Sequence, residues 1–432
     1  MSIWTDFGFR ASPYTTKPIP GNETGESLLV GRESELRKLK NRITSSELHP
    51  TIEGDNGVGK TSIVSVAAFQ LKKMAMEGNG SQVFLPLEES FQLSTTENLE
   101  AFENKVYYAV AQTLIDNRDL LQNTTIKEFG KINSLKRWLN SGIINSGGLG
   151  VNTPFGGASG SKGSSINSSA GYSESGFKKA VNEILFEAFP AREAGGVICV
   201  IDNLELMQTS GAVRRLLEEL RDGVLSAPGL IWILCGARGI VRTVASSWRA
   251  EGRYADPIEI SPIEDDVIEE MLSRRIDEFQ AVDTAIPPVG VTSFRYIYDI
   301  LHNNLRNAFK YSEDFSVWLA DEGLYENDSN ALDSRFATWI QERAKVSREE
   351  TQIGNRAWSV FNTLAERGGK ASPGDYSDYG FESSQAMRPH IKNLEEAQLV
   401  SSTSDENDKR RRTIVITARG WLVHFSNNAQ ED

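Results

Sequence analysis

The sequence contains few of the residues that build disulfide frameworks, metal sites or membrane spans. It has two cysteines, Cys199 and Cys235, and each lies in an apolar strand-like run rather than in a Cys-x-x-Cys pair, so both are expected to be buried and reduced. Its four histidines lack the spacing of metal ligands, which argues against structural zinc. No run is apolar enough to cross a bilayer and no signal-like segment opens the chain, so a soluble, cytoplasmic protein is expected.

Basic residues are also outnumbered, because 46 Lys and Arg face 59 Asp and Glu, for a net charge of −13. This balance opposes a protein whose whole surface binds phosphate backbones, so any contact with nucleic acid must be local. The length of 432 residues exceeds one ordinary compact core, and two or three domains are therefore expected.

The most informative motif is Gly54 to Thr61, which reads Gly-Asp-Asn-Gly-Val-Gly-Lys-Thr and lies between a short apolar segment and a helix-like run. This is a complete phosphate-binding loop, in which glycine backbone N–H groups surround the β- and γ-phosphates at a helix N-terminus. Lys60 is expected to reach these phosphates and the Thr61 hydroxyl to ligate Mg²⁺. The predicted nucleotide contacts in this loop are Asp55, Asn56, Gly57, Val58, Gly59, Lys60, Thr61 and Ser62.

Strand-like and helix-like segments alternate through the first two thirds of the chain, which is typical of an α/β domain. The expected strands lie near 51–52, 82–87, 197–201, 230–236 and 257–260. Their apolar composition favours a largely parallel five-stranded sheet with helices on both faces. The predicted fold class is therefore an α/β P-loop NTPase, followed by an α-helical lid and a C-terminal winged-helix domain.

Changes in composition divide the chain into four parts. Residues 1–30 are rich in Pro, Gly and Thr and are predicted to form an extended N-terminal arm. The ATPase core is assigned to 31–262, with a Gly/Ser-rich surface insertion at 140–176, and the helical lid to 263–350. Residues 351–427 show two helical segments and two strands, which indicate a winged helix.

Asp202 ends the apolar run 197–201, at the edge where open α/β sheets bind ligands. It is predicted to be the Walker B aspartate and, with Thr61, to hold Mg²⁺. The next residue is Asn203 rather than an acid, and an amide can orient water but cannot accept its proton. Hydrolysis is therefore expected to be slow, unless Glu205 or another subunit supplies the base.

Two arginines are candidates to sense the γ-phosphate. Arg238 follows the strand at 230–236, although a solvated surface role is equally consistent with its position. Arg306 starts a helix of the predicted lid, and bidentate contacts from its guanidinium would favour the triphosphate over the diphosphate.

Together these segments resemble the AAA+ and STAND branch of P-loop ATPases, in particular the origin-recognition-like initiator ATPases with a C-terminal winged helix. The resemblance implies that Val30, Gly31 and Arg32 lie beside adenine, that Arg238 is a first sensor and Arg306 a second, and that ATP and Mg²⁺ are the cofactors. The absence of an Asn-Lys-x-Asp motif also favours adenine over guanine. No arginine finger can be assigned beyond a weak candidate, Arg221.

The C-terminal module carries the best nucleic-acid feature of the chain. The expected recognition helix, 383–399, contains Arg388 and Lys392, and the expected wing carries Lys409, Arg410, Arg411 and Arg412. These cations could neutralise duplex phosphates with a strong salt dependence. Acidic residues at 395–396 and 405–408 oppose them, so a role as a protein adaptor stays open.

Three functions fit these features. The first is an ATP-dependent molecular switch, in which the nucleotide state controls oligomerisation and DNA binding by the winged helix. The second is a signalling or anti-phage defence ATPase that assembles with a partner effector protein. The third is a transposition or partition regulator. Homo-oligomers are expected, and membrane partners are not.

Overall fold

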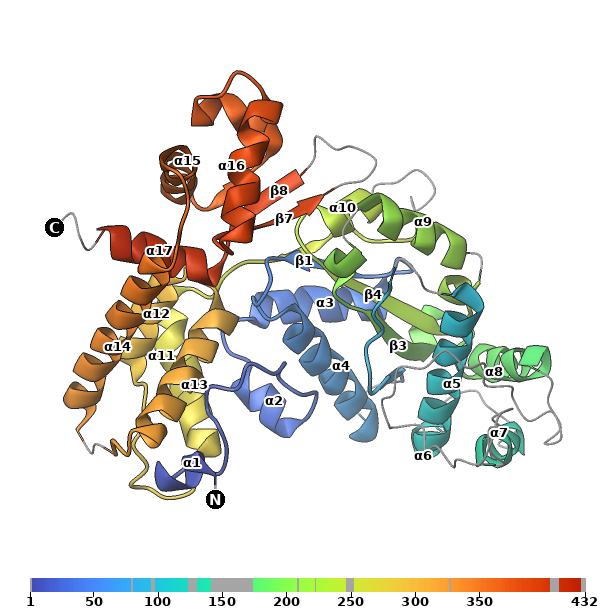
Figure 1. Cartoon of the computed structure of the whole chain (residues 1–432). Coiled ribbons are helices and arrows are strands. Elements are labelled where there is room, and N and C mark those ends of the chain that lie inside the picture. The colour runs from blue at the N-terminus through green and yellow to red at the C-terminus, as the bar shows by residue number, and fades with distance from the viewer. Residues whose placement is uncertain are drawn as a thin grey trace, which may run out of the picture.

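The computed structural model describes residues 2–78, 81–94, 98–122, 130–140, 174–207, 210–221, 223–245, 252–325, 328–404 and 412–428. Most of the insertion expected at 140–176 lies outside these described residues. Figure 1 shows three bodies: an α/β core, a helical lid beside it, and a C-terminal module that lies above the junction of the two. The nucleotide motif is in the core, close to that junction.

The core is built on one five-stranded parallel sheet, with its strands in the order β2-β3-β4-β1-β5. This order places β1, which leads into the phosphate loop, between β4 and β5, and it places β3 beside β4. The predicted parallel sheet is confirmed. Its strands are β1 (Thr51–Gly54), β2 (Val83–Pro86), β3 (Gly195–Ile201), β4 (Leu230–Gly236) and β5 (Ile258–Ile260).

The strands read as continuous apolar runs because both faces of the sheet are buried. In β4, Leu230, Trp232 and Leu234 join one core cluster, while Ile231 and Ile233 join the cluster on the opposite face. The two cysteines, Cys199 in β3 and Cys235 in β4, are buried and unpaired, as predicted.

Helices cover both faces of this sheet. One face packs against α3 (Glu33–Ser45) and α4 (Lys60–Met76), whose apolar side chains share a core with β1 and β5. The other face shares its core with residues of α5 (Leu99–Asp116), α7 (Gly130–Asn140) and α8 (Glu174–Ala188). Within the described ranges, no helix combines the length and apolarity that crossing a membrane requires. Also in the core are α6 (Arg118–Leu121), α9 (Ser210–Leu220) and α10 (Ile240–Ala245).

The lid consists of four helices around an aromatic core. They are α11 (Asp265–Phe279), α12 (Val291–Ile300), α13 (Leu305–Asp321) and α14 (Ser329–Glu349). Phe315 of α13 packs edge-on against Phe336 and Trp339 of α14, a favoured geometry for buried rings. This packing fixes α13, whose first turn faces the phosphate loop.

The N-terminal segment is more ordered than the extended arm that its composition predicts. It contains α1 (Ile3–Asp6) and α2 (Glu23–Leu28), and Trp4, Phe9 and Tyr14 are buried in the lid core. The fully buried Tyr14 hydroxyl donates to the Val289 carbonyl oxygen at 2.7 Å. Apolar burial against the lid, which the local composition does not reveal, accounts for the difference.

The C-terminal module has the topology of a winged helix. Its order is α15 (Asn355–Glu366), β6 (Lys370–Ala371), α16 (Ser384–Glu396), β7 (Val400–Ser404), β8 (Arg412–Ile416) and α17 (Ala418–Asn428). The three strands form an antiparallel sheet in the order β6-β8-β7. The sequence did not predict the two-residue β6. The helix expected at 383–399 is α16, which ends at Glu396 because the chain turns through the left-handed Gln398 (φ +59°) before β7.

We predict that stability falls in acid because of His49, a half-buried residue just before β1. Burial lowers its pKa from 6.5 to about 4. Its Nδ1 accepts from the Trp232 N–H at 3.3 Å, and its Nε2 pairs with the Leu225 carbonyl at 3.1 Å. Protonation of Nδ1 would therefore remove the acceptor for the Trp232 N–H. The unfolded chain binds this proton more readily, so the contribution is complete above about pH 6.5 and is lost as pH falls towards 4, by about 3 kcal/mol at most.

Denaturant unfolding between pH 4.5 and 7.5 measures this slope. In His49→Asn, which lacks the titrating ring, the free energy of unfolding should be lower at neutral pH and should change less across this range. An unchanged slope would show that other groups cause the acid sensitivity.

Candidate nucleotide site

The phosphate loop joins β1 to α4 in a conformation that requires glycine. Gly57 and Gly59 have φ values of +86° and +96°, in the left-handed region that L side chains rarely adopt. A Cβ on Gly57 would lie 2.8 Å from Arg306 Cβ and 2.9 Å from Asn304 Oδ1. Gly57 therefore lets the lid approach the loop closely.

Lys60 is the first residue of α4, and it is only 7% exposed. Its Nζ donates to the carbonyl oxygens of Gly54 and Asp55 at 3.0 and 3.1 Å. These bonds hold the ammonium beside the loop at the helix N-terminus, where the peptide dipoles also favour an anion.

The predicted magnesium pair is brought together although 141 residues separate its members. Thr61 Oγ1 donates to Asp202 Oδ2 at 2.6 Å, and Asp202 is 3% exposed. The other carboxylate oxygen accepts from the Asn203 N–H at 2.8 Å. A hydroxyl and a carboxylate at this spacing form a donor set of hard oxygens that suits Mg²⁺ carried by nucleotide phosphates. The residues present therefore fit the expected metal.

Asn203 and Glu205, which follow Asp202, differ in whether they line the pocket. Asn203 lines the pocket, and its φ of +56° lies in the left-handed region that asparagine tolerates. Glu205 Oε2 accepts from the Ala237 N–H at 3.0 Å, which holds this carboxylate at the end of β4, and it is not among the pocket-lining residues. Of the two, only Asn203 faces the pocket.

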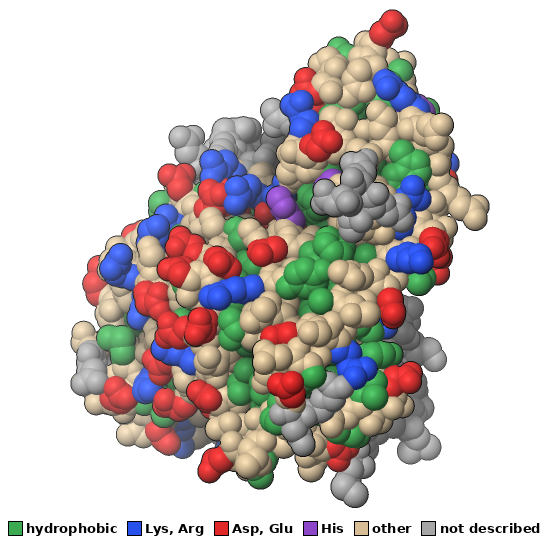
Figure 2. Space-filling view, turned by 90° about the vertical axis from the view of Figure 1, so that its left-hand side faces the viewer, with side chains coloured by type: hydrophobic (Ala, Val, Ile, Leu, Met, Phe, Trp, Pro, Cys, Tyr) green, Lys and Arg blue, Asp and Glu red, His purple; other side chains and the backbone are tan. Residues whose placement is uncertain are grey.

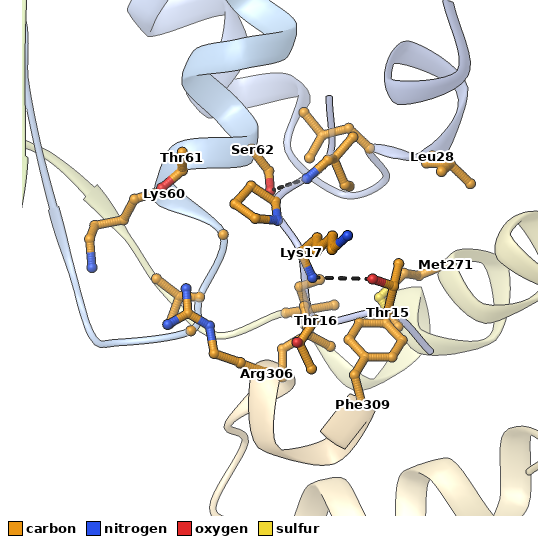
Figure 3. A pocket seen from close by; sticks show the side chains of 18 of the residues that line it. Thr15, Thr16, Lys17, Leu28, Lys60, Thr61, Ser62, Met271, Arg306 and Phe309 are labelled. Atoms are coloured by element: carbon orange, nitrogen blue, oxygen red, sulfur yellow. Dashed lines mark hydrogen bonds between the residues drawn. The ribbon is translucent and has the colours of Figure 1, made fainter. Parts of the chain in front are cut away.

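Of the two candidate sensor arginines, one lines the pocket and the other does not. Arg238 pairs with Glu259 at 2.6 Å and is 45% exposed, and it does not line the pocket. Arg306 lines the pocket, and its side chain rises from the lid towards the phosphate loop in Figure 3. Asn304 fixes this turn, because its Oδ1 caps Asn307 N at 3.0 Å while its Nδ2 donates to the Asn56 carbonyl at 3.1 Å.

Two residues of the Val-Gly-Arg segment lie at the pocket. Val30 is buried and, like Arg32, lines the pocket. The Arg32 guanidinium is 4% exposed and donates to the carbonyl oxygens of Val58 and Ser261 at 3.1 and 2.8 Å. Arg32 therefore joins the phosphate loop to the segment after β5. Gly31 has a φ of +67°, and Val267 Cγ1 would lie 2.6 Å from an added Cβ.

The sequence did not predict the remaining wall of the pocket. It includes Thr15–Ile19 of the N-terminal segment and Met271, Arg275 and Phe309 of the lid. Proline and threonine in the N-terminal segment indicate an extended chain, but they do not indicate which surface it crosses.

The residues proposed to contact nucleic acid are only partly described. Arg388 and Lys392 are exposed on α16, and Lys392 pairs with Glu396 at 3.3 Å. Lys409, Arg410 and Arg411 lie outside the described residues, and Arg412 begins β8. On the lid and winged-helix face drawn in Figure 2, acidic and basic side chains are interspersed, so that face does not present a field of one sign.

The parallel sheet, phosphate loop, helical lid and winged helix define this chain as a P-loop NTPase fold. Neither a family model nor a curated protein matches the sequence. Among solved structures, the chain is similar to the Aeropyrum pernix ORC1 protein in complex with DNA, with 15% identity, a TM-score of 0.43 and coverage of 98% of this chain and 99% of that one.

Two further structures are similar over nearly their whole length. The Aeropyrum pernix ORC2 protein, solved as ADPNP-ADP complexes, has 12% identity, a TM-score of 0.47 and coverage of 98% of each chain. Cdc6p from Pyrobaculum aerophilum has 15% identity, a TM-score of 0.38 and coverage of 97% and 96%. The fold assignment itself rests on the parallel sheet and the phosphate loop described above.

We predict that Arg306→Ala weakens ATP binding more than ADP binding. A guanidinium that rises from the lid towards the phosphate loop gains most from a γ-phosphate, and a charge-assisted contact of this kind contributes about 1.5–3 kcal/mol, or roughly tenfold or more in affinity. Titration calorimetry with both nucleotides measures the ratio of dissociation constants, with exposed Arg37→Ala as the control. An unchanged ratio would remove Arg306 from the role of sensor.

Proposed function

We propose that this protein binds ATP with Mg²⁺ and acts as a molecular switch that couples its nucleotide state to the winged helix. The observation that supports nucleotide binding most strongly is the Thr61–Asp202 hydrogen bond of 2.6 Å beside the buried Lys60. It joins the two halves of a magnesium and phosphate site from separate elements, α4 and the end of β3.

In this proposal hydrolysis is slow. Asn203 faces the pocket where a carboxylate would accept a proton from water, and Glu205 is bonded to the Ala237 N–H. An amide orients water without accepting its proton, so the general-base contribution of about 10²–10⁴ in rate is missing. The protein would therefore remain in the ATP state for long periods.

The contact between the winged helix and the phosphate loop supports the coupling. Lys370 Nζ in β6 pairs with Asp55 Oδ2 in the loop at 2.7 Å. Nearby, His302 of the lid stacks on Trp421 of α17, with ring centroids 4.5 Å apart and an interplanar angle of 16°. Phosphates that bind at the loop change the field at Asp55 and the position of the lid, and both changes act on the winged helix.

We further propose that the switch acts on duplex DNA through α16 and the wing. The exposed side of α16 carries Arg388 and Lys392, which suit phosphate or base-edge contacts in a major groove. The alternative is a partner effector protein in a signalling or defence assembly. The Lys392–Glu396 pair and the net charge of −13 favour this alternative, because both oppose binding to polyanions.

ATP turnover with and without duplex DNA, at low and moderate salt, tests the proposal. Lys60→Ala supplies the blank. Stimulation by DNA that weakens as salt rises would support the DNA-dependent switch, and Arg388→Ala should reduce it. Turnover that does not respond to DNA would favour the effector alternative, which predicts nucleotide-dependent self-association instead.

A further inference from the structure

The N-terminal segment crosses the pocket as a strap, defined here as Thr15–Ile19. All five strap residues line the pocket, and Figure 3 shows the strap passing between α4 and the lid helices. At its far end the Ile19 N–H donates to Ser62 Oγ at 3.0 Å, in the first turn of α4. This end of the strap is therefore attached beside the phosphate loop.

The near end is attached to the lid by Arg275 of α11. Its Nη1 donates to the carbonyl oxygens of Pro13 and Thr15 at 3.2 and 3.3 Å. The fully buried Tyr14 lies between these two carbonyls in sequence and anchors the same turn to Val289. Movement of the lid relative to the core must therefore move or stretch the strap.

A buried Arg275 has a high desolvation cost for a residue that only joins two segments. It is 5% exposed, burial lowers its pKa to about 10, and its Nε has no hydrogen-bond partner among the described residues. Its guanidinium lies 4.1 Å from the centroid of the Phe309 ring, and both residues line the pocket. An apolar side chain would pack here without the desolvation cost of a buried cation.

We propose that Arg275 is a positioning residue for the nucleotide. It holds the strap against the lid so that the strap encloses the base and ribose side of the pocket, and it thereby makes affinity for the nucleoside depend on the position of the lid. This inference rests on the proposed ATP binding. It concerns the nucleoside part of the ligand, whereas the phosphate loop, Lys60 and the helix N-terminus hold the phosphates.

Titrations with ATP, ADP and inorganic tripolyphosphate separate the two parts of the site. Arg275→Met should raise the dissociation constants of ATP and ADP about tenfold while leaving that of tripolyphosphate within about twofold, because tripolyphosphate has no nucleoside for the strap to enclose. Arg275→Lys, which keeps the charge and a donor, should fall between wild type and Arg275→Met. The control is Arg343→Met, since Arg343 also stacks on a lid ring, Trp339, at 4.2 Å but does not line the pocket.

Equal loss for all three ligands would show that Arg275 only stabilises the fold, and no loss for any would show that it does not position the strap; either result overturns the inference. If wild type binds none of them, the proposed nucleotide function itself has failed. If Arg275→Met does not fold, Arg275→Lys is compared with Arg275 in chains that carry Lys17→Cys. The new cysteine reports on the strap, because the native cysteines are buried. ATP should slow thiol labelling at position 17 at least threefold in the chain that keeps Arg275, and less in the Arg275→Lys chain. The same slowing in both chains would overturn the inference.

Discussion

Lys60→Ala is expected to weaken ATP binding by at least a hundredfold. The Lys60 ammonium is 7% exposed and is held by two loop carbonyls at the N-terminus of α4. Charge-assisted contacts to phosphate contribute about 1.5–3 kcal/mol each, and one ammonium makes more than one such contact to the β- and γ-phosphates. Calorimetric titration with ATP and Mg²⁺ measures the change directly.

Two further variants make this result specific. Lys60→Met keeps the apolar stem in its buried position, so equal losses in both variants assign the effect to the charge and not to a cavity. Lys38→Ala removes an exposed lysine of α3 and should leave the dissociation constant unchanged. ATP affinity that survives Lys60→Ala would mean that nucleotide does not bind at this loop.

Asp202→Asn is expected to lower ATP turnover about a hundredfold or more, because the carboxylate is needed to hold Mg²⁺ and the metal contributes several kcal/mol of charge stabilisation in phosphoryl transfer. The fold should survive, since an amide oxygen can still accept from Thr61 Oγ1, the bond that measures 2.6 Å. Phosphate release at saturating ATP, followed across a range of Mg²⁺ concentrations, is the appropriate assay.

The magnesium dependence separates this explanation from a general defect. In Asp202→Asn, nucleotide binding in the presence of a chelator should match wild type, while the strengthening by Mg²⁺ should be lost. Asp277→Asn, an exposed position on α11, is the control for removal of a carboxylate. Normal turnover in Asp202→Asn would exclude Asp202 as the magnesium ligand.

The sequence predicted those parts of the molecule that depend on residues close together in the chain. The five parallel strands follow from apolar runs that are buried on both faces, and the phosphate loop follows from glycine spacing before a helix. The carboxyl ends of parallel strands share one edge, which is why Asp202 could be placed beside Thr61 before the structure showed their hydrogen bond. The catalytic and binding roles of these residues stay predictions.

Contacts between distant segments could not be predicted in this way. The strap crosses the pocket because Tyr14 and Arg275 attach it to the lid, through contacts that span about 260 residues or more. Arg238 is paired with Glu259 because β5 follows β1 in the sheet, and strand order is not visible in local periodicity. Neither Arg275 nor Phe309 belongs to a recognisable motif, so no sequence signal marked them.

The central claim is that the nucleotide at the phosphate loop controls the position of the winged helix. Energy transfer between dyes at Lys38→Cys on α3 and Asn362→Cys on α15, both exposed positions, measures this distance while Cys199 and Cys235 stay buried. We expect the transfer efficiency to differ between saturating ATP and ADP, and this difference to disappear in Lys60→Ala. The same efficiency with ATP, with ADP and without nucleotide, in a chain that binds both, would contradict the switch.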